Sequence, residues 1–164
     1  VAAMNPCPCG YLGREARPCS CTPSMVSRYR SRISGPLLDR IDLHVYVRSL
    51  SPEEMLAPRE GEPSQVVRRR VVKARKRQRR RFPRRRTRVN AGMSPREVAR
   101  HCALDGSNRK MLRRAIERLA VSARACDRIL KVARTIADLA GSETIEPAHL
   151  QEAIQYRVRE EGEG

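Results

Sequence analysis

An arginine beside a short strand pattern is the first residue in this sequence that could take part in chemistry. Arg40 follows a short apolar turn within residues 34–47, SGPLLDRIDLHVYV. Residues 41–47 then alternate between apolar and other side chains, which predicts a strand with one apolar face. An arginine at the mouth of a buried strand is costly unless an anion pairs with it. The phosphate of a nucleotide held by a neighbouring subunit is one such anion, and the carboxylate of Asp39 or Asp42 is another.

Four cysteines form a second group that could do chemistry. Cys7-x-Cys9 and Cys19-x-Cys21 are two pairs separated by nine residues, in a loop (6–21) rich in proline and glycine. Four thiolates on one short loop can form a tetrahedral zinc site, and proline and glycine allow the sharp turns that bring the pairs together. Two other interpretations stay open, namely reduced thiols without metal and two disulfides. The absence of a signal peptide pattern argues against disulfides.

The elements that position Arg40 and the cysteines belong to a first part of the chain, residues 1–48. Residues 1–4 are apolar and end at Asn5, which predicts a short buried strand. Thr22-Pro23 then predicts a helix start before residues 24–33. Two strands and one helix are too few to fold alone. Because position 1 is not an initiator methionine, we expect the chain to be a fragment whose missing strands lie upstream.

The second part of the chain is expected to be all helical. Residues 49–64 contain proline and glutamate without a clear period and predict a linker. Residues 65–164 show helical periodicity with repeated cap signals, which predicts a small helical bundle. The expected helices begin near Gln65, Ser94, Ser107, Ser122 and Pro147, and the fourth ends at Gly141. The predicted fold is therefore the last strands of an α/β domain followed by an all-α domain.

The charge of the chain limits its partners. The 164 residues include 35 Lys and Arg against 18 Asp and Glu, a net charge of +17. Residues 68–88 contain fourteen Lys or Arg and no acidic residue. This excess favours polyanions such as DNA, RNA or nucleotides, although solvated basic helix faces would give the same composition. No run approaches the roughly 18 apolar residues of a membrane span, and no signal peptide is present, so we expect a cytoplasmic protein without membrane contact.

Four stretches of the sequence closely resemble one protein family. They are AAMNPCPCGYLG, CTPSMVSRYRSRISGPLLDRIDLHV, LAVSARACDRILKVARTIADLAG and HLQEAIQYR. These stretches resemble the C-terminal half of the Mg-chelatase-like AAA+ ATPases, in particular the bacterial YifB/ComM family. The resemblance implies a Rossmann-like P-loop core, a helical lid, ATP with Mg²⁺ as cofactor and a ring of identical subunits, expected to be a hexamer. ComM members are similar to DNA helicases that act in branch migration, so DNA is the other partner implied.

The resemblance implies roles for three residues. Asn5 matches sensor 1, a polar residue after a core strand that orients water or touches the γ-phosphate. Arg40 matches the arginine finger, which acts in trans on the γ-phosphoryl oxygens of a neighbouring subunit. Arg124 matches sensor 2, near the start of a lid helix where anions are favoured. Each has an ordinary structural alternative: a turn residue at Asn5, an ion pair at Arg40, and a surface position beside Arg128 for Arg124.

The sequence also departs from the complete family pattern. It contains no G-x-x-x-x-G-K-[ST] motif and no apolar run that ends in Asp-Glu. In the family, both motifs precede the region matched here, so we expect this chain alone not to hydrolyse ATP. Two other functions remain open: a non-enzymatic, zinc-dependent nucleic-acid-binding module, and a chelatase-type ATPase that acts on a tetrapyrrole-loading partner.

Overall fold

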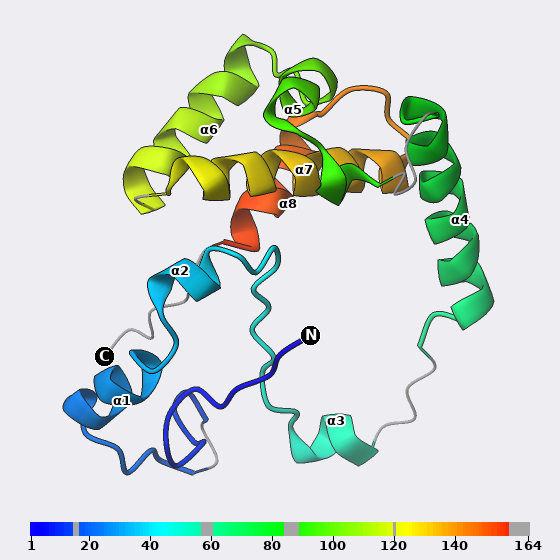
Figure 1. Ribbon diagram of the computed structural model, residues 1–164. Helices are drawn as coiled ribbons and strands as arrows, with labels where there is room; N and C mark the ends of the chain where they lie inside the picture. Colours follow the sequence, from blue (N-terminus) through cyan, green and yellow to red (C-terminus); the bar gives the residue numbers. More distant parts are fainter. Residues whose placement is uncertain (15–16, 57–60, 84–88, 120, 158–164) are drawn as a thin grey trace. The chain divides into compact units, whose positions relative to one another are not determined.

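The computed structural model describes residues 1–14, 17–56, 61–83, 89–119 and 121–157 (Figure 1). The described residues form two compact units. The first contains residues 1–41 and 46–56, and the second contains residues 42–45 and 61–157. Within both units, the regular structure of the described residues is entirely helical. None of these helices has both the length and the apolar character that crossing a membrane requires.

The first unit contains three short helices, α1 (Pro23–Arg30), α2 (Gly35–Leu38) and α3 (Pro52–Leu56). The start of α1 confirms the sequence prediction, because Thr22 Oγ1 accepts a hydrogen bond from the backbone N–H of Met25 at 3.3 Å and Pro23 occupies the first turn. Helix α3 lies in the segment expected to be a linker. A helix of five residues is too short to show a helical period, which is why the sequence pattern missed it.

The two strands expected at residues 1–4 and 41–47 are not present in the structure. A strand is defined by hydrogen bonds to a neighbouring strand. The long-range backbone bond described for these segments runs from His44 N–H to the carbonyl oxygen of Tyr156, at 2.9 Å. The side chains of Val45 and Val47 are 67% and 82% exposed. The sequence of residues 41–47 therefore alternates as a strand would, but the described residues contain no strand with which it could pair.

The second unit contains the five helices that the cap signals predict. They are α4 (Ser64–Arg81), α5 (Pro95–His101), α6 (Gly106–Leu119), α7 (Ala123–Ala140) and α8 (Pro147–Gln155), with a 3-10 turn, η1 (Asn90–Gly92), before α5. Ser94 and Glu97 form a capping box at α5, and Ser122 Oγ accepts from the backbone N–H of Ala125 at 3.2 Å at the start of α7. The predicted helical bundle is thus confirmed.

Helix α7 is the centre of this bundle and packs against α4, η1, α5 and α8 (Figure 1). Its inner face combines Ile129 with the small residues Ala133 and Ala137, all buried, and small residues let neighbouring helices approach closely. The surrounding core is mainly aliphatic. It also contains two larger side chains, Phe82 and Met93, that follow α4 and η1.

A buried polar network joins α4, η1 and α7. The carboxylate of Asp138 accepts two hydrogen bonds from Arg81, at 2.6 and 2.7 Å, and one from Asn90 Nδ2 at 2.8 Å. Arg134, one turn before Asp138 on α7, lies 3.2 Å from the same carboxylate and donates to the carbonyl oxygen of Glu143 at 2.7 Å. The network therefore ties the end of α4 and the η1 turn to the central helix.

Replacing Gly141 with alanine is expected to lower the free energy of unfolding of the chain by about 1–2 kcal/mol. Gly141 ends α7 with φ of +88°, and an added Cβ would lie 3.3 Å from Arg77 Nη2. Urea denaturation measures the change. Gly106→Ala is the matched control, because nothing lies within 4 Å of a Cβ there and the residue is helical. Equal stability of both variants would contradict the left-handed end of α7.

Candidate functional site

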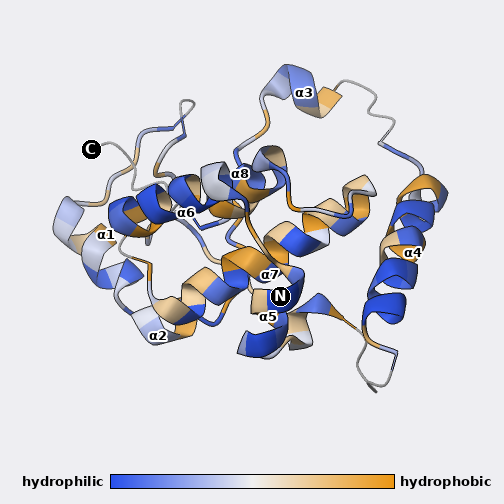
Figure 2. Cartoon of the chain, turned by 90° about the horizontal axis from the view of Figure 1, so that it is seen from above, coloured by the Kyte–Doolittle hydropathy of each residue, from blue (hydrophilic) through white to orange (hydrophobic). Residues whose placement is uncertain are grey.

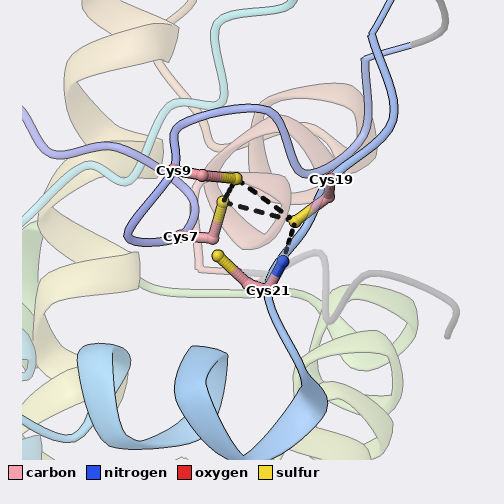
Figure 3. Close-up of side chains that lie close together, drawn as sticks. All are labelled: Cys7, Cys9, Cys19 and Cys21. Atoms are coloured by element: carbon pink, nitrogen blue, oxygen red, sulfur yellow. Dashed lines mark hydrogen bonds between the residues drawn. The ribbon is translucent and has the colours of Figure 1, made fainter.

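The four cysteines of the loop before α1 converge on one point (Figure 3). Their Sγ atoms all lie within 4.8 Å of one another. Cys7 Sγ lies 3.4 Å from Cys9 Sγ and 3.7 Å from Cys19 Sγ, and the Cys9 and Cys19 sulfurs are 3.5 Å apart. The N–H of Cys21 donates to Cys19 Sγ at 3.4 Å. The spacing of the two C-x-C pairs thus brings all four thiols together, as the sequence pattern suggested.

The local backbone explains why this loop closes on itself. Gly10 N–H donates to the carbonyl oxygen of Cys7 at 3.1 Å, which makes a tight turn, and Gly10 has φ of +81°, a conformation that favours glycine. The remaining turn is held by Arg17, whose guanidinium donates to the Tyr11 hydroxyl at 2.7 Å and lies 4.1 Å from the centre of its ring. These interactions fold the described residues between the two cysteine pairs back toward each other.

The sulfur distances fit a metal site and do not fit disulfides. A disulfide requires an S–S distance of about 2.05 Å, and all four cysteines are free in the structure. A tetrahedral zinc ion with Zn–S bonds of about 2.3 Å places its sulfurs about 3.8 Å apart. The distances among the sulfurs of Cys7, Cys9 and Cys19, 3.4–3.7 Å, are close to that value, and Cys21 Sγ lies within 4.8 Å of the other three. The donor set therefore fits a tetrahedral thiophilic cation, and free thiols remain the alternative.

The pKa values of the four thiols are driven apart. The backbone N–H of Tyr11 is the main cause that lowers the pKa of Cys9 to about 5. The N–H of Cys21 lowers the pKa of Cys19, but burial and the neighbouring thiols outweigh it and raise that pKa to about 12. Thiolates this close repel one another, so without a cation only part of the cluster ionises.

Two other cysteines have structural positions. Cys102 is buried in the core of the helical bundle and Cys126 on α7 packs against it. Burial raises the pKa of the Cys102 thiol to about 11 and also raises that of Cys126. Both cysteines therefore act as small core residues.

Asn5 and Arg40 both lie in the first unit with exposed side chains. Asn5 directly precedes the cysteine cluster, and a Cβ on Gly10 would lie 3.7 Å from its Nδ2. Arg40 follows α2, and its backbone N–H donates to the Leu37 carbonyl oxygen at 3.0 Å. In the part of the chain that the structure describes, the Arg40 guanidinium has no hydrogen-bond or ion-pair partner. Asp42, one of its expected structural partners, instead accepts a hydrogen bond from Arg128.

Arg124 occupies the first turn of α7 in the second unit and is exposed. It borders a surface groove of about 480 Å³ together with Arg128 and Lys131, which follow it on one edge of α7. The segment around Leu43 and the side chain of Tyr156 form other parts of the wall. Sequence reasoning missed Lys131, although its spacing of seven residues from Arg124 places both on one helix face and could have revealed it.

The cations of this groove differ in how well they are neutralised. Arg128 is paired with Asp42, and Lys131 Nζ donates to the carbonyl oxygen of Ala91 at 3.3 Å. The first turn of α7 contains no acidic residue, so Arg124 adds positive charge to the positive end of the helix dipole. The carboxylates of Asp42, Asp127 and Glu152 also line the groove and offset part of its positive charge.

Helix α4 presents a second cationic surface. It contains ten Lys or Arg and no acidic residue, and of its 18 residues only Ala74 and Gln78 are buried. In Figure 2, α4 is mainly blue with scattered orange valines. The basic residues therefore project from a helix that is anchored to the bundle at few points.

Comparisons with known proteins agree with the expected family. Residues 61–157 match the family model of the magnesium chelatase subunit ChlI C-terminal region, and residues 1–55 match that of the magnesium chelatase subunit ChlI. The chain is 42% identical over 161 residues to the uncharacterized protein YifB of Salmonella typhimurium and 43% identical to YifB of Escherichia coli. It is 42% identical to the competence protein ComM of Haemophilus influenzae.

Each of these three alignments covers 96% of the chain and 30% of the relative. The chain thus spans less than a third of the length of these relatives. The match to the C-terminal family model covers more than half of the chain, including all of α5 to α8. This protein therefore belongs to the magnesium chelatase subunit ChlI family, in the group of the YifB and ComM proteins.

Proposed function

We propose that this chain is the C-terminal part of a subunit of an AAA+ ATPase ring that remodels DNA. In this proposal, residues 1–48 complete the ATPase core, residues 49–64 are a linker and residues 65–164 form the lid. The segments 1–4 and 41–47 become strands when they join the remaining strands of the core. The P-loop and the carboxylate that holds Mg²⁺ come from the part of the protein outside this chain.

The exposed guanidinium of Arg40 is the observation that carries the proposal. It stands in the SGPLLDRIDL stretch, and one of its two expected structural partners, Asp42, is bound by Arg128. A guanidinium without an internal partner is available to an anion from another molecule. We assign it to the γ-phosphate of ATP held by a neighbouring subunit, in a ring that we take to be a hexamer.

Two further residues would contact the nucleotide of their own subunit. Arg124 lies at the N-terminus of an 18-residue helix without a first-turn carboxylate, a position that favours an anion. Asn5 is exposed and offers an amide beside the cysteine loop. We assign Arg124 to sensor 2 and Asn5 to sensor 1. Bound ATP would supply the scissile phosphoanhydride, and these side chains would orient and neutralise its terminal phosphate.

ATP hydrolysis by the full-length protein, with and without DNA, tests this function. We expect hydrolysis that DNA stimulates. Absence of hydrolysis would overturn the ATPase assignment. Stimulation by a chelatase partner and not by DNA would instead favour the chelatase-type alternative.

Helix α4 is proposed as a DNA phosphate contact, and its test requires only this chain. Arg69 and Arg80 are exposed, lie eleven residues apart and share one helix face. Replacing both with alanine is expected to weaken DNA binding and to reduce the slope of log K against log salt by up to about 2, or about 0.9 for each phosphate that the variant no longer neutralises. Fluorescence anisotropy with labelled duplex DNA at several salt concentrations measures both quantities.

Replacing Arg113 and Arg114 with alanine is the matched control, because both are exposed and lie on α6. This variant loses the same net charge. An equal loss of affinity and slope in both variants would show that DNA responds to total charge and would contradict a specific role for α4.

A further inference from the structure

The first unit has almost no apolar core of its own. Among its described residues, Cys7 is the one that is fully buried. Its larger apolar side chains are exposed, including Met4 at 50%, Met25 at 48% and Leu37 at 50%. Buried apolar area, the main driving force of folding, is therefore small among the residues of this unit that the structure describes.

The four cysteines of the cluster are shielded from solvent to different extents. Cys7 has an exposed fraction of 0%, and the other three cysteines are partly buried. Helix α1, which follows the cluster, is joined to the segment that precedes Cys7. Arg30 Nε on α1 donates a hydrogen bond to the carbonyl oxygen of Pro6 at 3.4 Å. The convergence of four thiols and this hydrogen bond thus connect the described segments 5–14 and 17–33.

The four sulfur donors determine which metal ion the cluster prefers. Four thiolates favour Zn²⁺ and disfavour Mg²⁺ and Ca²⁺, which prefer oxygen. Four protein ligands also close the coordination shell and leave no position for substrate, as in structural zinc sites. The N–H of Cys21 donates to Cys19 Sγ at 3.4 Å. Such backbone donors stabilise negative charge on sulfur and hold the ligands in orientation.

We propose that Cys7, Cys9, Cys19 and Cys21 bind one structural Zn²⁺ and that this ion orders the described segments 5–14 and 17–33. The site is separate from the nucleotide chemistry proposed above, since its coordination shell is complete without substrate. The ion affects function by fixing the position of Asn5, which precedes the first ligand by two residues.

Metal binding is tested with the 164-residue chain, purified and depleted of metal. After zinc is added back and the excess removed, we expect one Zn²⁺ per chain by elemental analysis. Titration of the depleted chain with Co²⁺ is expected to give the absorption of a tetrahedral tetrathiolate complex. Cys7→Ser and Cys19→Ser are each expected to lower zinc affinity by at least about 100-fold. Cys126→Ser is the matched control, since this half-buried cysteine lies on α7 and should leave stoichiometry and affinity unchanged.

Ordering by the metal is tested by hydrogen exchange on the same chain with and without Zn²⁺. Removal of zinc is expected to increase exchange in residues 5–33 and to leave α5 to α8 protected, which separates a local effect from global unfolding. Unchanged protection of residues 5–33 without zinc would overturn the ordering role. Iron in place of zinc, a disulfide in the purified chain, or unaltered affinity in Cys7→Ser would each overturn the site.

Discussion

Replacing Arg40 with alanine in the full-length protein is expected to reduce ATP hydrolysis by about 10³-fold or more, with ATP affinity nearly unchanged. An arginine finger acts on charge that develops as the phosphoryl group is transferred, so its loss affects the rate and has little effect on binding of the ground state. Steady-state hydrolysis and equilibrium binding of a labelled nucleotide measure the two quantities. A proportional loss of ATP affinity would instead make Arg40 an ordinary binding residue.

Mixing subunits tests whether Arg40 acts in trans. A second variant, altered at the P-loop lysine outside this chain, still carries Arg40 but cannot use its own nucleotide site. Mixed with Arg40→Ala subunits, it is expected to restore part of the activity, because some mixed interfaces join an intact P-loop with an intact arginine. Failure of the mixture to recover activity, although rings form, would contradict action between subunits.

Two further variants distinguish charge from geometry. Arg40→Lys keeps a cation but loses the planar fork, so we expect only a small part of the activity to return. Arg32→Ala removes another exposed arginine of the first unit and is expected to leave hydrolysis unchanged. If Arg32→Ala and Arg40→Ala lose the same amount of ATP hydrolysis, the activity depends on the total positive charge of the first unit and not on Arg40 itself.

Local signals in the sequence were sufficient to predict the helical bundle. Ser122 caps α7, and Gly141 ends it in a left-handed conformation, as their residue types suggested. Each signal depends on neighbours within one helical turn, so it is visible without knowledge of the fold. The convergence of the two C-x-C pairs was predictable for the same reason, because the connecting loop is short and contains Gly10.

Features that depend on distant partners were not predictable in this way. The alternating residues 41–47 do not form a strand among the described residues, because a strand needs a neighbour that local sequence does not specify. The pairing of Arg128 with Asp42 joins residues 86 positions apart, and the sequence offered several equivalent partners for each. In the sequence Arg128 was noted only as a neighbour of Arg124, whereas in the structure it pairs with Asp42.

The burial of Asp138 was also missed, and it carries the second large prediction. In the sequence Asp138 is one acidic residue in an amphipathic helix, and such residues usually lie on the exposed face. In the structure its exposed fraction is 1%, and Arg81, Asn90 and Arg134 surround it. Burial alone would raise the pKa of Asp138, but the hydrogen bonds from Arg81 and Asn90 outweigh it and hold the pKa below its usual value.

Replacing Asp138 with alanine is therefore expected to lower the free energy of unfolding of the chain by about 3–5 kcal/mol, because it leaves two arginines buried without their counterion. The unfolded carboxyl binds a proton more readily than the native one, so the stabilisation is complete above the ordinary pKa of aspartate. It is lost as the pH falls through the lower native pKa. Urea denaturation at neutral pH and at a series of acidic pH values measures both effects.

An exposed ion pair supplies the control for this prediction. Arg70 lies 2.7 Å from Glu62, close to the 2.6 Å between Arg81 and Asp138, but its side chain is 55% exposed and that of Arg81 only 14%. Arg70→Ala is expected to change stability by less than about 1 kcal/mol. In a double-mutant cycle, Arg81→Ala and Asp138→Ala should couple by more than about 1 kcal/mol. If the two substitutions change stability additively, the network does not join α4 to α7. If loss of the exposed pair lowers stability as much as loss of the buried pair, the distance between the charges matters and their burial does not.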